Sequence, residues 1–208
     1  LKHAKEAILE NSRKKKNNVF LVPFDLNVKK EVVNGSDKIL RLSKHKLDII
    51  VLNSGVFNHK GFLEASEKDW NKAILYKFKS MFWIVNEFLP SMLKNRSGHI
   101  VHIGSIYTKE PRFGYLLSNS ARLLMTGYLK CLADNVALQD VRVNQVLCGY
   151  IATERLISHF REMAKIKKIP KDEVENNVKK DIPMKRFGSP EEVASVVRFL
   201  CSDKSSYI

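Results

Sequence analysis

The chain has 208 residues and a formal net charge of +14, and its length fits one domain over residues 1–208. The lysines are spread along the chain in short runs and form no stripe with base-reading aromatic residues, which argues against nucleic-acid binding. Three widely spaced cysteines, Cys131, Cys148 and Cys201, suggest no disulfide framework or zinc site, and we expect core or near-core thiols. No apolar run is long enough to span a bilayer and the charged start is unlike a signal peptide, so a cytoplasmic protein is expected.

Short apolar runs alternate with helical patterns along the chain, an order that is typical of parallel βαβ units. In chain order, the predicted strands are residues 19–22, 48–52, 99–103 and 141–147. Long helices are predicted over residues 69–94 and 118–138, and residues 153–185 predict two helices joined at Pro170. These elements favour an α/β fold with a parallel sheet and right-handed crossovers.

The most informative motif begins with the apolar run of residues 98–104, which ends at Ser105. Thirteen positions later Ser118 begins an amphipathic helix, and Arg122 follows it by one helical turn. Residues four apart lie on the same face of a helix, so we expect Ser118 and Arg122 to point in the same direction.

Other motifs occupy turns and helix starts in the rest of the chain. Asn53-Ser54-Gly55 ends the strand over residues 48–52, and Asp69-Trp70 begins the long helix that follows. Residues 148–153 follow the last predicted strand, and residues 186–193 begin the C-terminal segment. With the motif at Ser105, these segments resemble the short-chain dehydrogenase/reductase family, in particular its 3-oxoacyl carrier-protein reductase branch, over essentially the whole chain.

The resemblance implies a three-layer, Rossmann-like, doubly wound parallel sheet. It also implies an oxidoreductase that uses NAD or NADP to interconvert carbonyls and alcohols, with an acyl thioester as one candidate substrate. The family's Gly-rich pyrophosphate turn does not precede Lys2, and the chain stops at Ile208, where the family continues into a further strand. We therefore expect a fragment of a longer protein, truncated at both ends of the fold, in which the choice between NAD and NADP lies upstream.

A serine, a tyrosine, a lysine and an asparagine share the chemistry in the family, and the last three are replaced here. Ser105 matches the serine, Ser118 the tyrosine and Arg122 the lysine, while Lys77, seven residues after Trp70, matches the asparagine. A serine hydroxyl has no useful acidity near pH 7, whereas Arg122 stays protonated and could stabilise an oxyanion. Lys77 is a candidate for the missing cation or proton donor, with a helix-face lysine as the alternative. For Ser105 the alternative is a structural role at a strand end.

Tyr115, three residues before Ser118, is another candidate proton donor if its loop is shifted, with packing or a substrate contact as the alternative. The resemblance also implies contacts with the cofactor at the turns that follow the predicted strands. A plain strand-ending turn is the alternative for Asn53 and Gly55. The implied cofactor-binding residues are Asp25, Leu26, Asn53, Ser54, Gly55, Ile103, Gly104, Arg122, Gly149, Ile151 and Thr153.

Residues 153–185 match the segment that covers the substrate in the family. Their apolar residues suit an acyl substrate, although packing of a helix on the core explains the same spacing. The family's helices over residues 69–94 and 118–138 form subunit interfaces, so we expect a homodimer or homotetramer. The histidines form no metal-binding pattern, and no metal is expected.

Two other classes of function remain open. One is a catalytically inactive nucleotide-binding protein that acts as a sensor or scaffold, because three of the four catalytic residue types are replaced. The other is a structural subunit that pairs with an active homologue through its long helices. Cofactor binding without turnover would favour the inactive nucleotide-binding protein over the reductase. Self-assembly without cofactor binding would favour the structural subunit.

Overall fold

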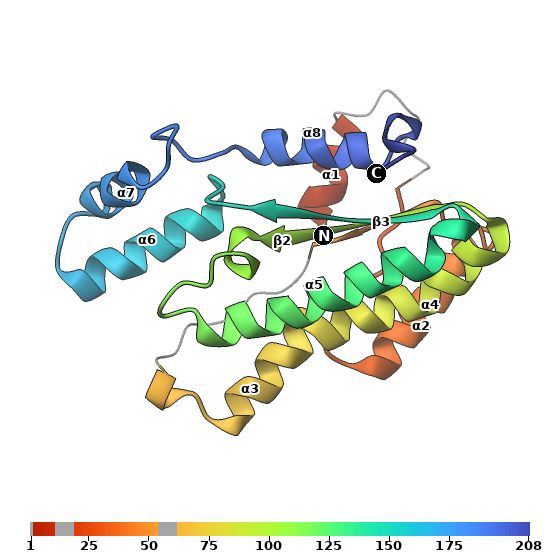
Figure 1. The fold of residues 1–208 in the computed structure, drawn as a ribbon, viewed down its shortest axis with the longest axis horizontal. Helices are drawn as coiled ribbons and strands as arrows, with labels where there is room; N and C mark the ends of the chain where they lie inside the picture. Colours follow the sequence, from red (N-terminus) through yellow and green to blue (C-terminus); the bar gives the residue numbers. More distant parts are fainter. Residues whose placement is uncertain (1, 11–18, 54–61) are drawn as a thin grey trace.

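The computed structural model describes residues 2–10, 19–53 and 62–208 (Figure 1). Most of these residues lie in helices that surround one small sheet. In chain order the helices are α1 (Lys2–Glu10), α2 (Lys29–Leu42), α3 (Glu67–Ile74), α4 (Ser80–Asn95), α5 (Leu116–Val136), α6 (Glu154–Lys167), α7 (Lys171–Lys180) and α8 (Pro190–Leu200).

The strands of the described residues, β1 (Ile49–Leu52), β2 (Gly98–Ser105) and β3 (Val141–Cys148), form a parallel sheet in the order β1-β2-β3. They confirm three of the four predicted strands. The prediction of a strand over residues 19–22 is wrong, since these residues are irregular. A strand needs a neighbour to complete its hydrogen bonds, and within the described residues β1 has a neighbour on one side only.

Helices lie on both faces of the sheet, as expected for Rossmann-like layers (Figure 1). The main core lies between one face and helices α2, α4 and α5, and receives Ile50 from β1 and Ile100 from β2. On the other face lies α8, where Nδ1 of His99 donates a hydrogen bond of 2.9 Å to the Leu200 carbonyl oxygen. The mixed α/β fold with a parallel sheet is thereby confirmed.

The predicted helix over residues 69–94 is present but has a π-helical turn at Leu75–Lys79, between α3 and α4. At its start, the Ser66 hydroxyl accepts from the Asp69 backbone N–H while the Asp69 carboxylate accepts from the Ser66 backbone N–H. A π turn holds an extra residue, and such turns are frequent at functional sites. Lys77 lies in the middle of this turn and is buried.

The two predicted helices of residues 153–185 are confirmed as α6 and α7, with Pro170 immediately before α7. Phe160 of α6 is buried, whereas Ile166 is exposed, so only part of the apolar pattern packs on the core. Among the described helices, none has both the length and the apolar character that a membrane crossing requires.

One cysteine differs from expectation. Cys148 and Cys201 are half-buried, but Cys131 is exposed on α5, so the prediction of a core or near-core thiol is wrong for Cys131. Leu123 and Leu124 of the same helix are also exposed, and they extend an apolar surface that includes the half-buried Tyr128.

Candidate active site

Ser105 lies at the carboxyl end of β2 and is aligned with Cys148 at the end of β3. Its hydroxyl accepts a hydrogen bond of 3.3 Å from the Tyr107 backbone N–H, and its carbonyl oxygen accepts one of 3.0 Å from the Thr108 hydroxyl. These contacts cap a short 3-10 turn over Ile106–Thr108. These contacts fix the Ser105 hydroxyl at the carboxyl ends of the strands, where ligands bind in open parallel sheets.

Ser118 and Arg122 lie on one face of α5, as their spacing predicts. Nε of Arg122 donates to the Ser118 hydroxyl oxygen at 3.4 Å. Arg122 is half-buried, and burial followed by the charge of Arg155 lowers the pKa of its guanidinium. The Arg122 charge also acts on the Cys148 thiol, which places the guanidinium near the carboxyl end of β3.

Lys77 is only 2% exposed, whereas lysine side chains are mostly exposed in proteins. Burial, followed by the charges of Arg122 and Arg155, lowers the pKa of Lys77 to about 7. Near neutral pH the amine therefore populates both its charged and its neutral form. The structure thus brings together three of the sequence-predicted residues, Ser118, Arg122 and Lys77.

His102 belongs to the same buried region, although no motif of the sequence pointed to it. It is 1% exposed, and burial followed by Arg122 and Lys77 lowers its pKa to about 4, so the ring is neutral at pH 7. Nε2 of Gln145 donates to Nδ1 of His102 at 2.7 Å, and the Thr126 hydroxyl lies 3.0 Å from Oε1 of Gln145. The sequence signal that could have identified His102 was a histidine within an apolar strand.

Aromatic residues flank the site at the start of α5. The hydroxyls of Tyr107 and Tyr150 are hydrogen bonded at 2.8 Å, and the rings of Tyr107 and Tyr115 are 5.0 Å apart. Burial raises the pKa of Tyr115 and, more strongly, that of Tyr107. Both phenols are therefore poorer proton donors at neutral pH than an ordinary tyrosine, which weakens the case for Tyr115 as the missing acid.

The sequence-predicted cofactor positions follow the strand ends where the structure describes them. Asn53 is exposed immediately after β1, whereas Ser54 and Gly55 lie outside the described residues. Asp25 is exposed near the start of α2, where Oδ1 accepts from the backbone and side-chain nitrogens of Asn27 at 2.8 and 2.9 Å. Leu26 beside it is half-buried.

Beyond β3, Gly149 is exposed and has open space where a Cβ would be. Ile151 forms an isolated bridge with Gly188, and the Thr153 hydroxyl caps α6. On β2, Ile103 is half-buried.

Gly104 is buried and faces the helix layer. A Cβ there would lie 2.8 Å from the Leu147 side chain and 3.0 Å from the Gln145 side chain. Close packing alone therefore explains this glycine.

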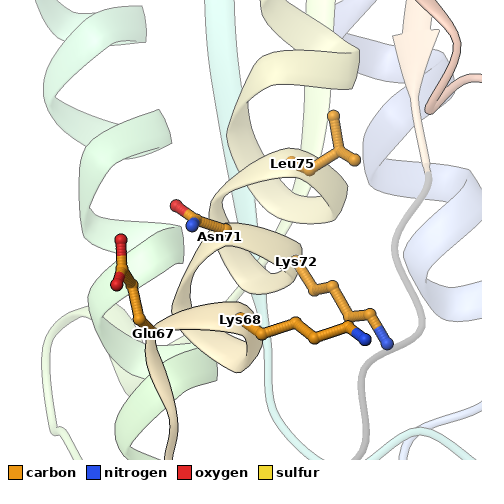
Figure 2. Close-up of a pocket in the computed structure, with 5 residues that line it drawn as sticks. All are labelled: Glu67, Lys68, Asn71, Lys72 and Leu75. Carbon is orange, nitrogen blue, oxygen red and sulfur yellow. The ribbon is translucent and has the colours of Figure 1, made fainter.

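A surface pocket of about 520 Å³ lies on α3, apart from these residues. Figure 2 shows Lys68 and Lys72 extending to one side of the helix and Glu67 and Asn71 to the other; Leu75 completes the lining. None of the candidate catalytic residues lines this pocket. The described residues also contain no group of histidine, cysteine and carboxylate side chains that could hold a metal.

A family model described as enoyl-(acyl carrier protein) reductase matches residues 1–208. The chain belongs to the short-chain dehydrogenase/reductase family. It is 35% identical to the 3-oxoacyl-[acyl-carrier-protein] reductase FabG of Aquifex aeolicus, over 78% of this chain and 61% of the relative. With FabG of Thermotoga maritima the identity is 34%, over 89% of this chain and 72% of the relative. This chain thus spans about three fifths to three quarters of the length of these relatives.

Solved structures agree with the family's fold. YwfH, described as an NADPH-dependent reductase involved in bacilysin biosynthesis, matches with a TM-score of 0.92 and 24% identity, over 100% of this chain and 79% of that one. ElxO with NADP bound matches with a TM-score of 0.83 and 23% identity, over 99% and 80%. At these identities the likeness supports the fold alone.

Proposed function

We propose that this family member is an NAD(P)-dependent oxidoreductase that interconverts a carbonyl and an alcohol, with an acyl thioester as one candidate substrate. Residues 1–208 act as one domain in which residues 153–185 cover the substrate. The observation that carries the proposal is the burial of Lys77 next to Arg122. A buried amine beside a guanidinium is costly to keep in a fold without a functional use.

Each polar residue has a role in reduction that its surroundings permit. The Ser105 hydroxyl donates a hydrogen bond to the substrate carbonyl oxygen, and the Arg122 guanidinium stabilises the negative charge that develops on that oxygen. Lys77 donates the proton, because a pKa of about 7 suits a general acid near neutral pH. Ser118 accepts from Nε of Arg122 and thereby orients the guanidinium.

The residues at the strand ends fit a nicotinamide dinucleotide, NAD or NADP. The open space at Gly149 admits a close ligand, and Asn53 presents an exposed amide after β1. When bound, the nicotinamide supplies or accepts the hydride. The proposed binding set is Asp25, Leu26, Asn53, Ser54, Gly55, Ile103, Gly104, Arg122, Gly149, Ile151 and Thr153.

The proposal is tested by following NADPH and NADH oxidation by the full-length protein, with simple ketones and 3-oxoacyl thioesters as substrates. Turnover of at least one carbonyl is expected, together with cofactor binding measured by fluorescence. Cofactor binding without any turnover would instead support the second candidate, an inactive nucleotide-binding protein. That candidate is favoured by the replacement of three catalytic residue types and by the raised pKa of Tyr115.

A further inference from the structure

Three tyrosines lie beyond the carboxyl ends of β2 and β3, the ends that point toward α6 (Figure 1). Tyr107 lies in the short turn that follows β2, Tyr150 follows β3 by two residues, and Tyr115 immediately precedes α5. The last residues of the two strands, Ser105 and Cys148, are aligned with each other. The tyrosines therefore lie at the end of the sheet where ligands bind in open parallel folds.

Direct contacts join the three side chains into one group, which we call the tyrosine cluster. The rings of Tyr107 and Tyr115 are 5.0 Å apart and tilted by 51°, and those of Tyr107 and Tyr150 are 6.5 Å apart at 83°. The Tyr107 hydroxyl donates a hydrogen bond of 2.8 Å to the Tyr150 hydroxyl. Tilted and edge-to-face rings attract each other, so these contacts hold the cluster in one arrangement.

The tyrosine cluster is attached to the proposed reacting centre. The backbone N–H of Tyr107 donates to the Ser105 hydroxyl oxygen at 3.3 Å, so the turn that carries the Tyr107 ring also fixes the serine. Tyr115 lies three residues before Ser118, at the start of the same helix. A substrate whose carbonyl oxygen is held by Ser105 therefore places the group next to its carbonyl beside these rings.

Aromatic side chains of the C-terminal half continue the cluster. Nε2 of His159, in α6, lies 3.4 Å from the Tyr115 hydroxyl, and the ring of Phe187 is 6.2 Å from that of Tyr150. Phe187 is in turn 5.4 Å from the ring of Phe160, which is buried. The aromatic surface thus extends from the strand ends onto the proposed covering segment.

The tyrosine cluster can receive a ligand, since all three of its residues are half-buried and none is sealed in the core. In the part of the chain that the structure describes, the hydroxyl of Tyr150 has a single hydrogen-bond partner, Tyr107, and it accepts that bond. A phenol can donate as well as accept. The O–H of Tyr150 is therefore available to an oxygen of a bound molecule.

We propose that the tyrosine cluster binds a ring-bearing substrate. The carbonyl under reduction is attached to a flat ring that packs against Tyr107 and Tyr115, and Tyr150 donates a hydrogen bond to an oxygen on that ring. This inference rests on the proposed function and narrows its substrate class from carbonyls in general to aryl ketones and similar compounds. A flat ring is favoured over a linear chain because it adds aromatic contacts to the burial of apolar area. No proton transfer is assigned to these tyrosines.

The first test compares acetophenone with 2-octanone, two methyl ketones with equal numbers of carbon atoms. Tyr115→Leu keeps an apolar side chain and removes the ring, so it is expected to raise KM for acetophenone roughly 2- to 10-fold, the range of an aromatic pair. KM for 2-octanone should stay within about twofold. Each substrate is compared with itself between proteins, so intrinsic reactivity cancels. Tyr207→Leu, at a position that is 102% exposed, is the matched control and should change neither value.

The second test removes only the hydroxyl of Tyr150. Methoxyacetophenones are compared with the ethylacetophenones of the same shape, which lack the ring oxygen. Tyr150→Phe is expected to lower kcat/KM for the best methoxy isomer roughly 2- to 10-fold, the range of a neutral hydrogen bond, and to leave its ethyl counterpart unchanged. Tyr207→Phe is the control.

Two results would overturn the inference. The first is a ratio of acetophenone to 2-octanone that is the same in the wild type and in Tyr115→Leu. The second is a wild-type enzyme that turns over linear 3-oxoacyl thioesters with a higher kcat/KM than every aryl ketone.

A failure of the proposed function is recognised separately by saturation-transfer NMR of acetophenone with the NADP⁺-treated full-length protein. Transfer to the ring protons that Tyr115→Leu weakens supports the ring site even if no carbonyl is turned over. Turnover of linear carbonyls without such transfer rejects the ring site and leaves the proposed function standing. Absence of both transfer and turnover rejects both proposals.

Discussion

At the scale of single residues, Lys77 is the most informative departure from the family's pattern. It lies in a π turn, is nearly inaccessible and has two cationic neighbours. Burial and the two neighbouring charges both oppose the charged form of the amine, so the residue is held at the point where a proton is easily given up.

Replacing Lys77 with methionine separates its function from its stability. We expect Lys77→Met to lower kcat by roughly 10²–10⁴, the contribution of a positioned general acid. The same change should raise the free energy of unfolding at pH 7 by roughly 1–4 kcal/mol, because a buried cation is replaced by an apolar side chain of similar length. Steady-state kinetics and urea denaturation measure the two effects. Lys79→Met, at an exposed position, is the control; a Lys77→Met enzyme with full activity would exclude the proposed role.

The pH profile of the reduction tests the same residue without replacing it. The proposed proton donation needs the ammonium form of Lys77, so kcat/KM is expected to fall as pH rises above about 7. Arg122→Gln removes a positive neighbour and should move this fall to higher pH. A profile that is flat through neutral pH in both proteins would contradict the assignment.

His102 should make the fold sensitive to acid. Its pKa is lowered from 6.5 to about 4. Its contribution to stability is therefore complete above pH 6.5 and is lost as the pH falls from 6.5 to about 4. His102→Asn is expected to reduce the loss of unfolding free energy between these pH values by roughly 1–3 kcal/mol. Thermal melts along a pH series give the slope. The exposed His3 offers the control His3→Asn, and equal slopes in all three proteins would refute the prediction.

At the scale of elements, most helices and three strands followed from periodicity and turn residues, because those signals are local. The π turn at Leu75–Lys79 was not predicted: the apolar spacing on either side fits an ordinary helix, and the extra residue is accommodated by contacts with α5. The strand predicted over residues 19–22 is absent because its signal is only local: an apolar run forms a strand only where a neighbouring strand completes its hydrogen bonds.

For the site, spacing alone placed Ser118 and Arg122 on one face, but Arg155 and His102 come from elements far apart in sequence.

Packing between β2 and β3 gives a prediction at this scale. Gly104→Ala would place a Cβ 2.8 Å from the Leu147 side chain, and it should lower the free energy of unfolding by roughly 1–3 kcal/mol. Gly127, in α5, has open space around it, so Gly127→Ala should raise stability by roughly 0.5–1 kcal/mol. Chemical denaturation of both variants checks the pair. Equal effects of the two changes would show that the packing argument is wrong.

At the scale of the whole molecule, the exposed apolar surface of α5, formed by Leu123, Leu124, Tyr128 and Cys131, fits the expected homodimer or homotetramer. We expect Leu124→Glu to shift the protein to a smaller species in size-exclusion chromatography with light scattering, because a charge would be buried in the interface. Leu138→Glu, at a position that is 84% exposed at the end of this segment, should have a smaller effect. A wild-type protein that is monomeric at all concentrations would contradict the interface.

We propose that a buried lysine and an arginine carry out reduction where the family uses a tyrosine and a lysine. The most direct test measures NADPH binding and NADPH oxidation by the full-length protein and by Arg122→Ala, with the same carbonyl substrates. We expect binding with turnover in the wild type and loss of turnover in the variant. Binding of NADPH with no turnover of any carbonyl would contradict it and would identify a nucleotide-binding protein without catalytic activity.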